Sequence, residues 1–258
     1  MDRESQQRSA RNRFTGRAAV YSRFRPSYPK KYIDYLIVAN SLVPGSTVAD
    51  SGSGTGILSR QLLDRSLKVF AVEPNSDMRQ TAERELVCYP SFISIDATAE
   101  DTTLDRESID LVTAAQAFHW FDREKFKAEC RRVLKEGAKV ALVWNSRDYT
   151  SNLVQENENI CKKYCADFVA FSHGIESKPE VFSEFYKDGK YKIMAFRNDV
   201  HYDLESYIGR NLSGSYATNE SGRNYQPFVQ ELANVFEKYS QDGIMTMPGI
   251  TRSYLGSV

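Results

Sequence analysis

The fold is decided by a short stretch that reads Val48-Ala49-Asp50-Ser51-Gly52-Ser53-Gly54-Thr55-Gly56-Ile57-Leu58. An apolar run enters a turn with three glycines at alternate positions, and a second apolar run follows the turn. Glycine adopts backbone angles that other residues avoid and lets a ligand approach the main chain, while the start of a helix presents unpaired N–H groups. The stretch therefore predicts a strand, a ligand-binding turn and a helix in succession.

Short β-prone runs recur around this turn, at residues 47–50, 68–72, 92–95, 109–113 and 139–144. Helical patterns occupy three of the four intervals between them, at residues 57–65, 76–86 and 122–134. Such alternation is typical of a parallel sheet covered by helices on both faces. The first half of the chain therefore predicts an α/β fold.

The flanking segments are less regular. A polar, Arg-rich arm precedes a helical pattern that starts at Pro29. After residue 150 the patterns predict helices at 151–170, from Pro179, at 203–211 and at 226–239, with strands at 190–199 and 244–256. Because no long linker interrupts the chain, we expect one domain over residues 1–258, divided into an N-terminal lid (1–27), a cofactor-binding core (28–145), and a cap with the final strands (146–258).

Composition narrows the classes of partner. The chain has 258 residues, 41% hydrophobic and 26% charged, and its 34 basic residues balance 34 acidic ones. A net charge of zero gives no global field for nucleic acid or an anionic membrane, so a small molecule is the expected partner. No apolar run approaches the roughly 18 residues of a membrane span, and the polar start lacks a secretory core. We therefore expect a cytoplasmic protein with cysteines as thiols and, from their spacing, no metal site.

The spacing of the turn limits the ligand. A dinucleotide fingerprint needs a third glycine where Ile57 stands, and a phosphate loop needs a Gly-Lys-Ser/Thr sequence that is absent here. Glu73 ends the second predicted strand, 21 residues after Gly52. An acid there can accept hydrogen bonds from ribose hydroxyls, although a solvated loop acid is the alternative. Met78, one helical turn further on, could pack on a purine or in the core.

These residues resemble the class I S-adenosylmethionine-dependent methyltransferases, and within them the type 11 group that includes trans-aconitate methyltransferase-like enzymes. The resemblance is carried by residues 50–56, 73–78, 98–100, 116–122, 131–138 and 144–147, and more weakly by 14–26, 213–217 and 251–256. It implies a Rossmann-like, seven-stranded, mostly parallel sheet with an N-terminal lid and a C-terminal cap. The implied activity is methyl transfer to an oxygen or nitrogen atom of a small-molecule acceptor.

The resemblance also implies S-adenosyl-L-methionine as the cofactor. The residues expected to bind it are Tyr21, Asp50, Gly52, Ser53, Gly54, Gly56, Glu73, Pro74, Met78, Thr98, Ala99, Glu100 and Gln116. Tyr21 would close over the methionine end of the cofactor, or else anchor the N-terminal arm to the core.

The acceptor is less constrained by the sequence. His119 is the candidate base, with a structural loop histidine as the alternative. The expected substrate-binding residues are Arg17, Arg25, Trp120, Trp144, Arg147 and Tyr216. The arginines would suit a carboxylate, which would make the protein a carboxyl methyltransferase of a polyacid such as trans-aconitate. The alternatives are salt bridges of the lid for the arginines and core packing for the aromatic residues. Because aromatic candidates outnumber cationic ones, a flat, neutral acceptor is favoured.

Other classes remain open on the sequence. A nicotinamide oxidoreductase would share the fold, and a non-catalytic module would bind the cofactor without turnover. A methyltransferase of RNA or protein is disfavoured by the zero net charge. The oligomeric state is left open.

Overall fold

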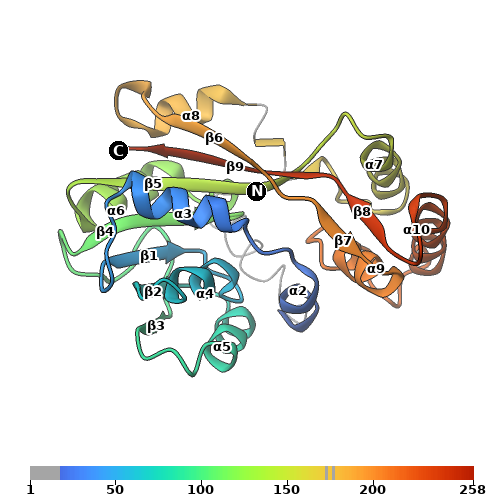
Figure 1. Cartoon of the computed structure of the whole chain (residues 1–258), viewed down its shortest axis with the longest axis horizontal. Coiled ribbons are helices and arrows are strands. Elements are labelled where there is room, and N and C mark those ends of the chain that lie inside the picture. Colours follow the sequence, from blue (N-terminus) through green and yellow to red (C-terminus); the bar gives the residue numbers. More distant parts are fainter. Residues whose placement is uncertain (1–17, 172–173, 176–177) are drawn as a thin grey trace.

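The computed structural model describes residues 18–171, 174–175 and 178–258 (Figure 1). Its main sheet has seven strands in the order β3-β2-β1-β4-β5-β9-β6. The strands are β1 (Thr47–Ser51), β2 (Lys68–Val72), β3 (Phe92–Ile95), β4 (Ile109–Ala115), β5 (Leu134–Arg147), β6 (Lys192–Arg197) and β9 (Gly249–Gly256). Strands β1 to β5 are mutually parallel, whereas β9 runs antiparallel to β5 and β6. The predicted seven-stranded, mostly parallel sheet is confirmed.

Helices cover both faces of this sheet. On one face, α3 (Lys30–Ala39) and α4 (Ile57–Leu63) contribute Tyr32, Leu36 and Leu62 to a buried apolar cluster. On the opposite face, α6 (Arg123–Val133) and α8 (Pro179–Phe185) contribute aromatic side chains to a second cluster. The helix α5 (Ser76–Glu85) follows β2. Apolar side chains on both faces explain why the central strands read as continuous hydrophobic runs.

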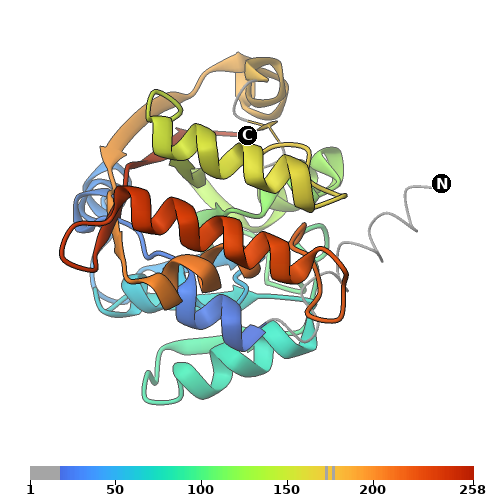
Figure 2. The ribbon, with the colours of Figure 1, turned by 90° about the vertical axis from the view of Figure 1, so that its right-hand side faces the viewer.

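The end of the chain builds a third apolar cluster beside the sheet. It is formed by α7 (Asn152–Tyr164), α9 (Leu204–Leu212), α10 (Tyr225–Tyr239) and the hairpin of β7 (Val200–Tyr202) with β8 (Met245–Met247). These elements lie at the right of Figure 1 and face the viewer in Figure 2. The expected cap therefore has a core of its own, which follows from the amphipathic character of its helices.

Several predicted elements differ from the structure, among them the strand expected at 139–144, which is longer and spans Leu134–Arg147 as β5. The strand expected at 244–256 is two strands, because Pro248 interrupts it and β8 pairs with β7 outside the main sheet. The strand expected at 190–199 ends at Arg197, and β7 follows it. The helix expected at 151–170 ends at Tyr164. Local periodicity marks these segments as strand or helix but does not fix where the chain turns.

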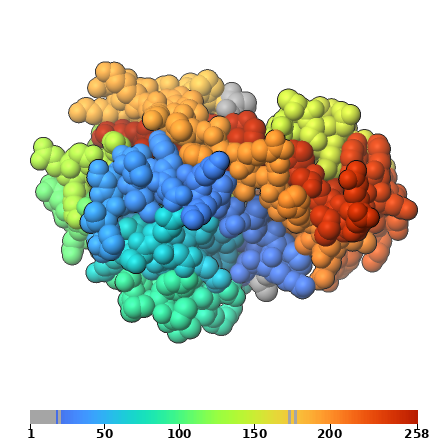
Figure 3. Space-filling model, viewed as in Figure 1, coloured from blue at the N-terminus to red at the C-terminus, as the bar shows by residue number. Residues whose placement is uncertain are grey.

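The described part of the expected lid is residues 18–27, which contain α2 (Ala18–Phe24); this helix packs between α5 and α9. The ring of Phe24 packs directly against Gly209, where an added Cβ would come within 2.5 Å of a ring atom. In Figure 3 this blue segment fills the space between the cyan core and the orange C-terminal helices. Helix α2 thus connects the sheet to the cap at the edge where β1 and β4 end.

No helix in the described ranges combines the length and apolar character needed to cross a bilayer. The cytoplasmic location stays a prediction.

Candidate functional site

The glycine turn after β1 adopts the conformation that the sequence predicts. Gly52, Gly54 and Gly56 all have positive φ angles, of 67°, 57° and 79°. A Cβ at Gly52 would lie 2.7 Å from the Cβ of Ala117, and one at Gly56 would lie 2.7 Å from Leu86. A Cβ at Gly54 would meet no protein atom within 4 Å. Two of the glycines are thus required by close packing, whereas Gly54 faces open space.

Asp50, at the end of β1, supports this turn through hydrogen bonds inside the protein. Its carboxylate accepts hydrogen bonds from the hydroxyls of Ser59 at 2.7 Å and Thr113 at 2.8 Å, so it links β1 to α4 and β4. Burial raises its pKa to about 6, and the two hydrogen bonds oppose this rise. Because Asp50 is fully buried and outside the pocket lining, it positions the turn and does not reach a ligand.

Glu73, at the end of β2, joins the turn to α5. One carboxylate oxygen accepts the N–H of Gly54 at 2.9 Å, and the other accepts the N–H of Asn75 at 2.8 Å. Burial raises the pKa of Glu73, and these two backbone hydrogen bonds are the main opposing influences. An ionised carboxylate has about four acceptor positions, so roughly two remain for hydroxyls of a ligand. Asn75 in turn caps α5 by accepting the N–H of Met78.

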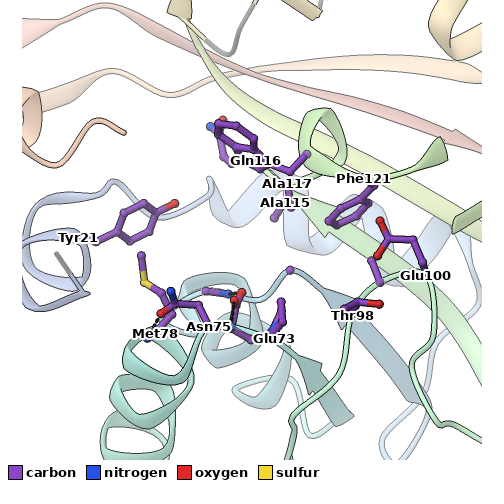
Figure 4. A pocket seen from close by; sticks show the side chains of 15 residues that line it. Tyr21, Glu73, Asn75, Met78, Thr98, Glu100, Ala115, Gln116, Ala117 and Phe121 are labelled. Atoms are coloured by element: carbon purple, nitrogen blue, oxygen red, sulfur yellow. Dashed lines mark hydrogen bonds between the residues drawn. The ribbon is translucent and has the colours of Figure 1, made fainter. Parts of the chain in front are cut away.

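A pocket with about 810 Å³ of space opens over this turn (Figure 4). Figure 4 shows Glu73 and Asn75 across from Gln116 and Ala117, with Tyr21 and Phe121 at opposite ends. This first pocket lies at the carboxyl ends of the neighbouring strands β1 and β4, the usual ligand position in a doubly wound sheet. Its lining is Tyr21, Gly52, Gly54, Glu73, Pro74, Asn75, Met78, Thr98, Ala99, Glu100, Ala115, Gln116, Ala117, Trp120 and Phe121.

Most of the predicted cofactor residues meet in the first pocket, but three do not line it. Asp50 lies beneath the turn. Gly56 packs against Leu86 and faces away, and Ser53 is not in the lining. Glu100 lines the pocket while it accepts the N–H of Asp122, the residue that caps α6. The first pocket also contains four residues that sequence reasoning missed: Asn75, Ala115, Ala117 and Phe121.

A second pocket, with about 590 Å³ of space, adjoins the first. The two share Tyr21, Gln116 and Trp120 as walls. The other residues that line the second pocket are Arg25, His119, Asn145, Arg147, Ala170, Phe171, Arg210, Ser215 and Tyr216. His119 belongs to the short helix η1 (Phe118–Trp120), and its ring lies 4.7 Å from that of Trp120.

The predicted acceptor residues divide between the second pocket and other places. Arg25, Trp120, Arg147 and Tyr216 line it, together with His119. Trp144 does not: it is fully buried among Phe118, Phe182 and Tyr254, so its expected contact with an acceptor is corrected to a packing role. Arg17 lies outside the described residues. Arg210 and Phe171 were not predicted, because a helix pattern or an isolated aromatic gives no direction toward a pocket.

The described residues contain no cluster of three or more His, Cys, Asp or Glu side chains that could hold a metal ion.

Comparison with known proteins found similarity to methyltransferases. Residues 49–142 match the model of a methyltransferase domain. An uncharacterised methyltransferase of Mycobacterium tuberculosis is 39% identical over 143 residues, which are 55% of this chain and 56% of that protein. A methyltransferase-like protein of Schizosaccharomyces pombe, also uncharacterised, is 31% identical over 154 residues, 59% of each chain. The chain thus matches a little more than half the length of these curated relatives.

Solved structures share the fold. A protein of Anaeromyxobacter dehalogenans described as a type II methyltransferase superposes with a TM-score of 0.65 at 22% identity, covering 91% of this chain and 98% of that one. Phosphoethanolamine N-methyltransferase 2 of Haemonchus contortus, solved with S-adenosyl-L-methionine, gives a TM-score of 0.53 at 15% identity, with 95% and 57% covered. Residues 49–142 are therefore similar to a methyltransferase domain, and the chain shares its fold with solved methyltransferase structures.

Proposed function

We propose that this protein is an S-adenosylmethionine-dependent methyltransferase that methylates a small-molecule acceptor on oxygen or nitrogen. The observation that carries the proposal is the pair of adjoining pockets with three shared walls. One pocket opens over the glycine turn of the methyltransferase domain, and the other contains His119 and several cations. A donor and an acceptor could therefore meet beside Tyr21, Gln116 and Trp120.

The residues of the first pocket fit the proposed cofactor. The open space at Gly54 is a cradle that any side chain would fill, which suits the close approach of a ligand to the backbone. The remaining acceptor positions of Glu73 suit the ribose hydroxyls, and Met78 beside Asn75 suits a flat base. Thr98, Ala99 and Glu100 would border the adenine. When bound, S-adenosylmethionine supplies an electrophilic methyl group on its sulfonium.

The residues of the chain would then hold the acceptor, exclude water and, where needed, accept a proton. Tyr21 and Trp120, in the shared wall, would hold the acceptor against the cofactor and keep water away from the reacting atoms. Gln116 is held by a hydrogen bond that its amide donates to the carbonyl of Asn145, at 3.2 Å. His119 lies where it could accept a proton from a hydroxyl or an amine, whereas an acceptor that reacts through a carboxylate would not need it.

The rival classes make different predictions for binding. A nicotinamide oxidoreductase would bind NADH, and a module without activity would bind S-adenosylhomocysteine but never produce it. Calorimetric titration with S-adenosylhomocysteine and with NADH, followed by an assay for S-adenosylhomocysteine release over a panel of phenols, amines and carboxylic acids, separates them. We expect binding of S-adenosylhomocysteine alone and release with at least one acceptor. Preference for NADH would contradict the proposal.

A further inference from the structure

The second pocket is lined by three arginines from distant parts of the chain. Arg25 directly follows α2, Arg147 is the last residue of β5, and Arg210 lies in α9. No Asp or Glu is among the residues that line this pocket. Although the chain as a whole has no net charge, the lining of this pocket contains three arginines and no acidic residue.

These arginines lack acidic partners among the described residues. Arg25 donates to the hydroxyl and the carbonyl of Ser213, both neutral, at 3.0 and 2.9 Å. The Nη1 atoms of Arg147 and Arg210 are buried, and neither has a hydrogen-bond partner in the described ranges. By contrast Arg23, two residues before Arg25, pairs with Glu205 at 2.9 Å on the exposed side of the same two helices.

Burial makes this arrangement costly for the free protein. Arg147 is only 8% exposed, and its guanidinium lies 3.5 Å from the centre of the Phe171 ring, which holds the group but supplies no hydrogen-bond acceptor. Burial, and then the charges of Arg25 and Arg147, lower the pKa of Arg210 to about 10, so it stays cationic near neutral pH. Buried charges are normally paired or neutralised. The two buried guanidinium groups of Arg147 and Arg210, which have no acidic partner among the described residues, therefore indicate that a ligand supplies the missing hydrogen-bond acceptors.

We infer that the acceptor is an organic anion, and that Arg147 and Arg210 bind its carboxylate or phosphate group in the second pocket. This inference rests on the proposed function. Carboxylate and phosphate groups each present two or more oxygen atoms that can accept parallel hydrogen bonds from the N–H groups of one guanidinium. This inference replaces the neutral acceptor that the sequence favoured. Arg210 adds a cation to the residues that line the second pocket, and Trp144, an expected aromatic contact, is absent from them.

The position of the arginines also separates the bound anion from the reacting atom. Tyr21, Gln116 and Trp120 line both pockets. Arg147 and Arg210 line the second pocket and a third hollow, but not the first pocket. The arginines therefore lie on the side away from the cofactor. The anionic group they hold is an anchor, and the atom that receives the methyl group is another atom of the same molecule, nearer the shared wall.

Binding of simple anions tests the inference without knowledge of the acceptor. The protein, saturated with S-adenosylhomocysteine, is titrated at constant ionic strength with tricarballylate, with inorganic phosphate and with the neutral tricarballylamide. We expect saturable binding of at least one anion and none of the amide. Tighter binding of tricarballylate would assign a carboxylate anchor, and tighter binding of phosphate a phosphate anchor.

Matched variants locate the site. Arg147→Gln and Arg210→Gln should each weaken anion binding at least tenfold, or by about 1.4 kcal/mol, while Arg223→Gln, in an exposed turn, should not. Arg210→Lys keeps the charge and should bind with intermediate affinity, which guards against a variant that fails to fold. Removal of an unmatched buried charge should also leave the melting temperature of the ligand-free Arg210→Gln protein equal to or above that of the wild type.

The outcomes separate the two proposals. If wild type binds S-adenosylhomocysteine but binds the anions no better than Arg210→Gln does, the anion site is refuted and the methyltransferase proposal stands. If tricarballylate or phosphate competes with S-adenosylhomocysteine, the anion occupies the first pocket and the anchor is refuted. If S-adenosylhomocysteine itself does not bind, the proposed function fails first.

Discussion

Gly54 offers the sharpest test of the cofactor site, because its effects on the fold and on the ligand can be separated. Gly54 has a φ of 57°, lines the first pocket, and has no protein atom within 4 Å of an added Cβ. Gly45, in the exposed turn before β1, has a φ of 87° and equally open surroundings, but it lies outside the pocket lining. Gly54→Val and Gly45→Val therefore introduce comparable backbone strain, and only the first adds bulk where the ligand would bind.

The strain alone has a predictable size. A non-glycine residue held at a positive φ costs about 1–3 kcal/mol, and each kcal/mol lowers the melting temperature of a chain of this size by about 2–4 °C. Both variants should therefore melt about 2–12 °C below wild type. If Gly54→Val is much less stable than Gly45→Val, then its surroundings are not open and the comparison fails.

Ligand binding then distinguishes the two variants. At 100 times its dissociation constant, S-adenosylhomocysteine should stabilise wild type and Gly45→Val by about 2.7 kcal/mol. If Gly54→Val weakens binding at least tenfold, the same concentration stabilises it by about 1.4 kcal/mol or less. Thermal melts with and without ligand, with calorimetric dissociation constants, give both quantities. Equal affinity in the three proteins would refute the placement of the cofactor against the glycine turn.

Three further predictions follow from the buried acids and His119. Glu73→Gln should weaken S-adenosylhomocysteine binding about 10- to 100-fold. It should also destabilise the fold, because the amide nitrogen must face the N–H of Gly54 or Asn75. Calorimetry measures the first effect and thermal melting the second, and the control Glu85→Gln, at a surface ion pair with Arg60, should show neither. Because the pKa of Asp50 is raised to about 6 in the fold, its protonated form adds stability that is fully present below its unfolded pKa and lost as pH rises through 6. In urea unfolding, the free energy of unfolding of Asp50→Asn should therefore rise relative to that of wild type by about 2 kcal/mol as the pH increases from 4.5 to 7.5. A difference between the two proteins that does not change with pH would contradict the buried charge. His119→Gln should lower kcat about 10²- to 10⁴-fold with S-adenosylhomocysteine affinity unchanged if the acceptor atom carries a proton; unchanged kcat would assign a reacting carboxylate.

The sequence predicted the first pocket far better than the second. The glycine turn and Glu73 lie at the ends of neighbouring strands, so local pattern and parallel topology together bring them to one edge. Gly56 and Asp50 were assigned to the ligand for the same reason. The structure shows instead that they support the turn, because a motif position does not reveal which way a side chain or Cα faces.

Trp144 and Arg210 show why the acceptor side was harder to predict. Trp144 ends a run on a strand covered on both faces, so alternation along β5 gives no distinction between core and pocket. Arg210 lies in a nine-residue amphipathic helix, where its spacing reads as an ordinary charged position. It lines the second pocket together with Tyr21 and Arg25, which the packing of α2 on α9 brings close. The contact of Phe24 with Gly209 in this packing joins residues 185 positions apart in the sequence.

The two halves of the site therefore rest on different grounds. The match to a methyltransferase domain covers residues 49–142, which include every residue of the first pocket except Tyr21. Arg25, Arg147 and Arg210 all lie outside that range. Similarity to known methyltransferases thus supports the donor but carries no information on these cations. Proteins that share the domain can differ in the segments that supply the three arginines, so the anion anchor is a property to be tested in this chain by its own variants.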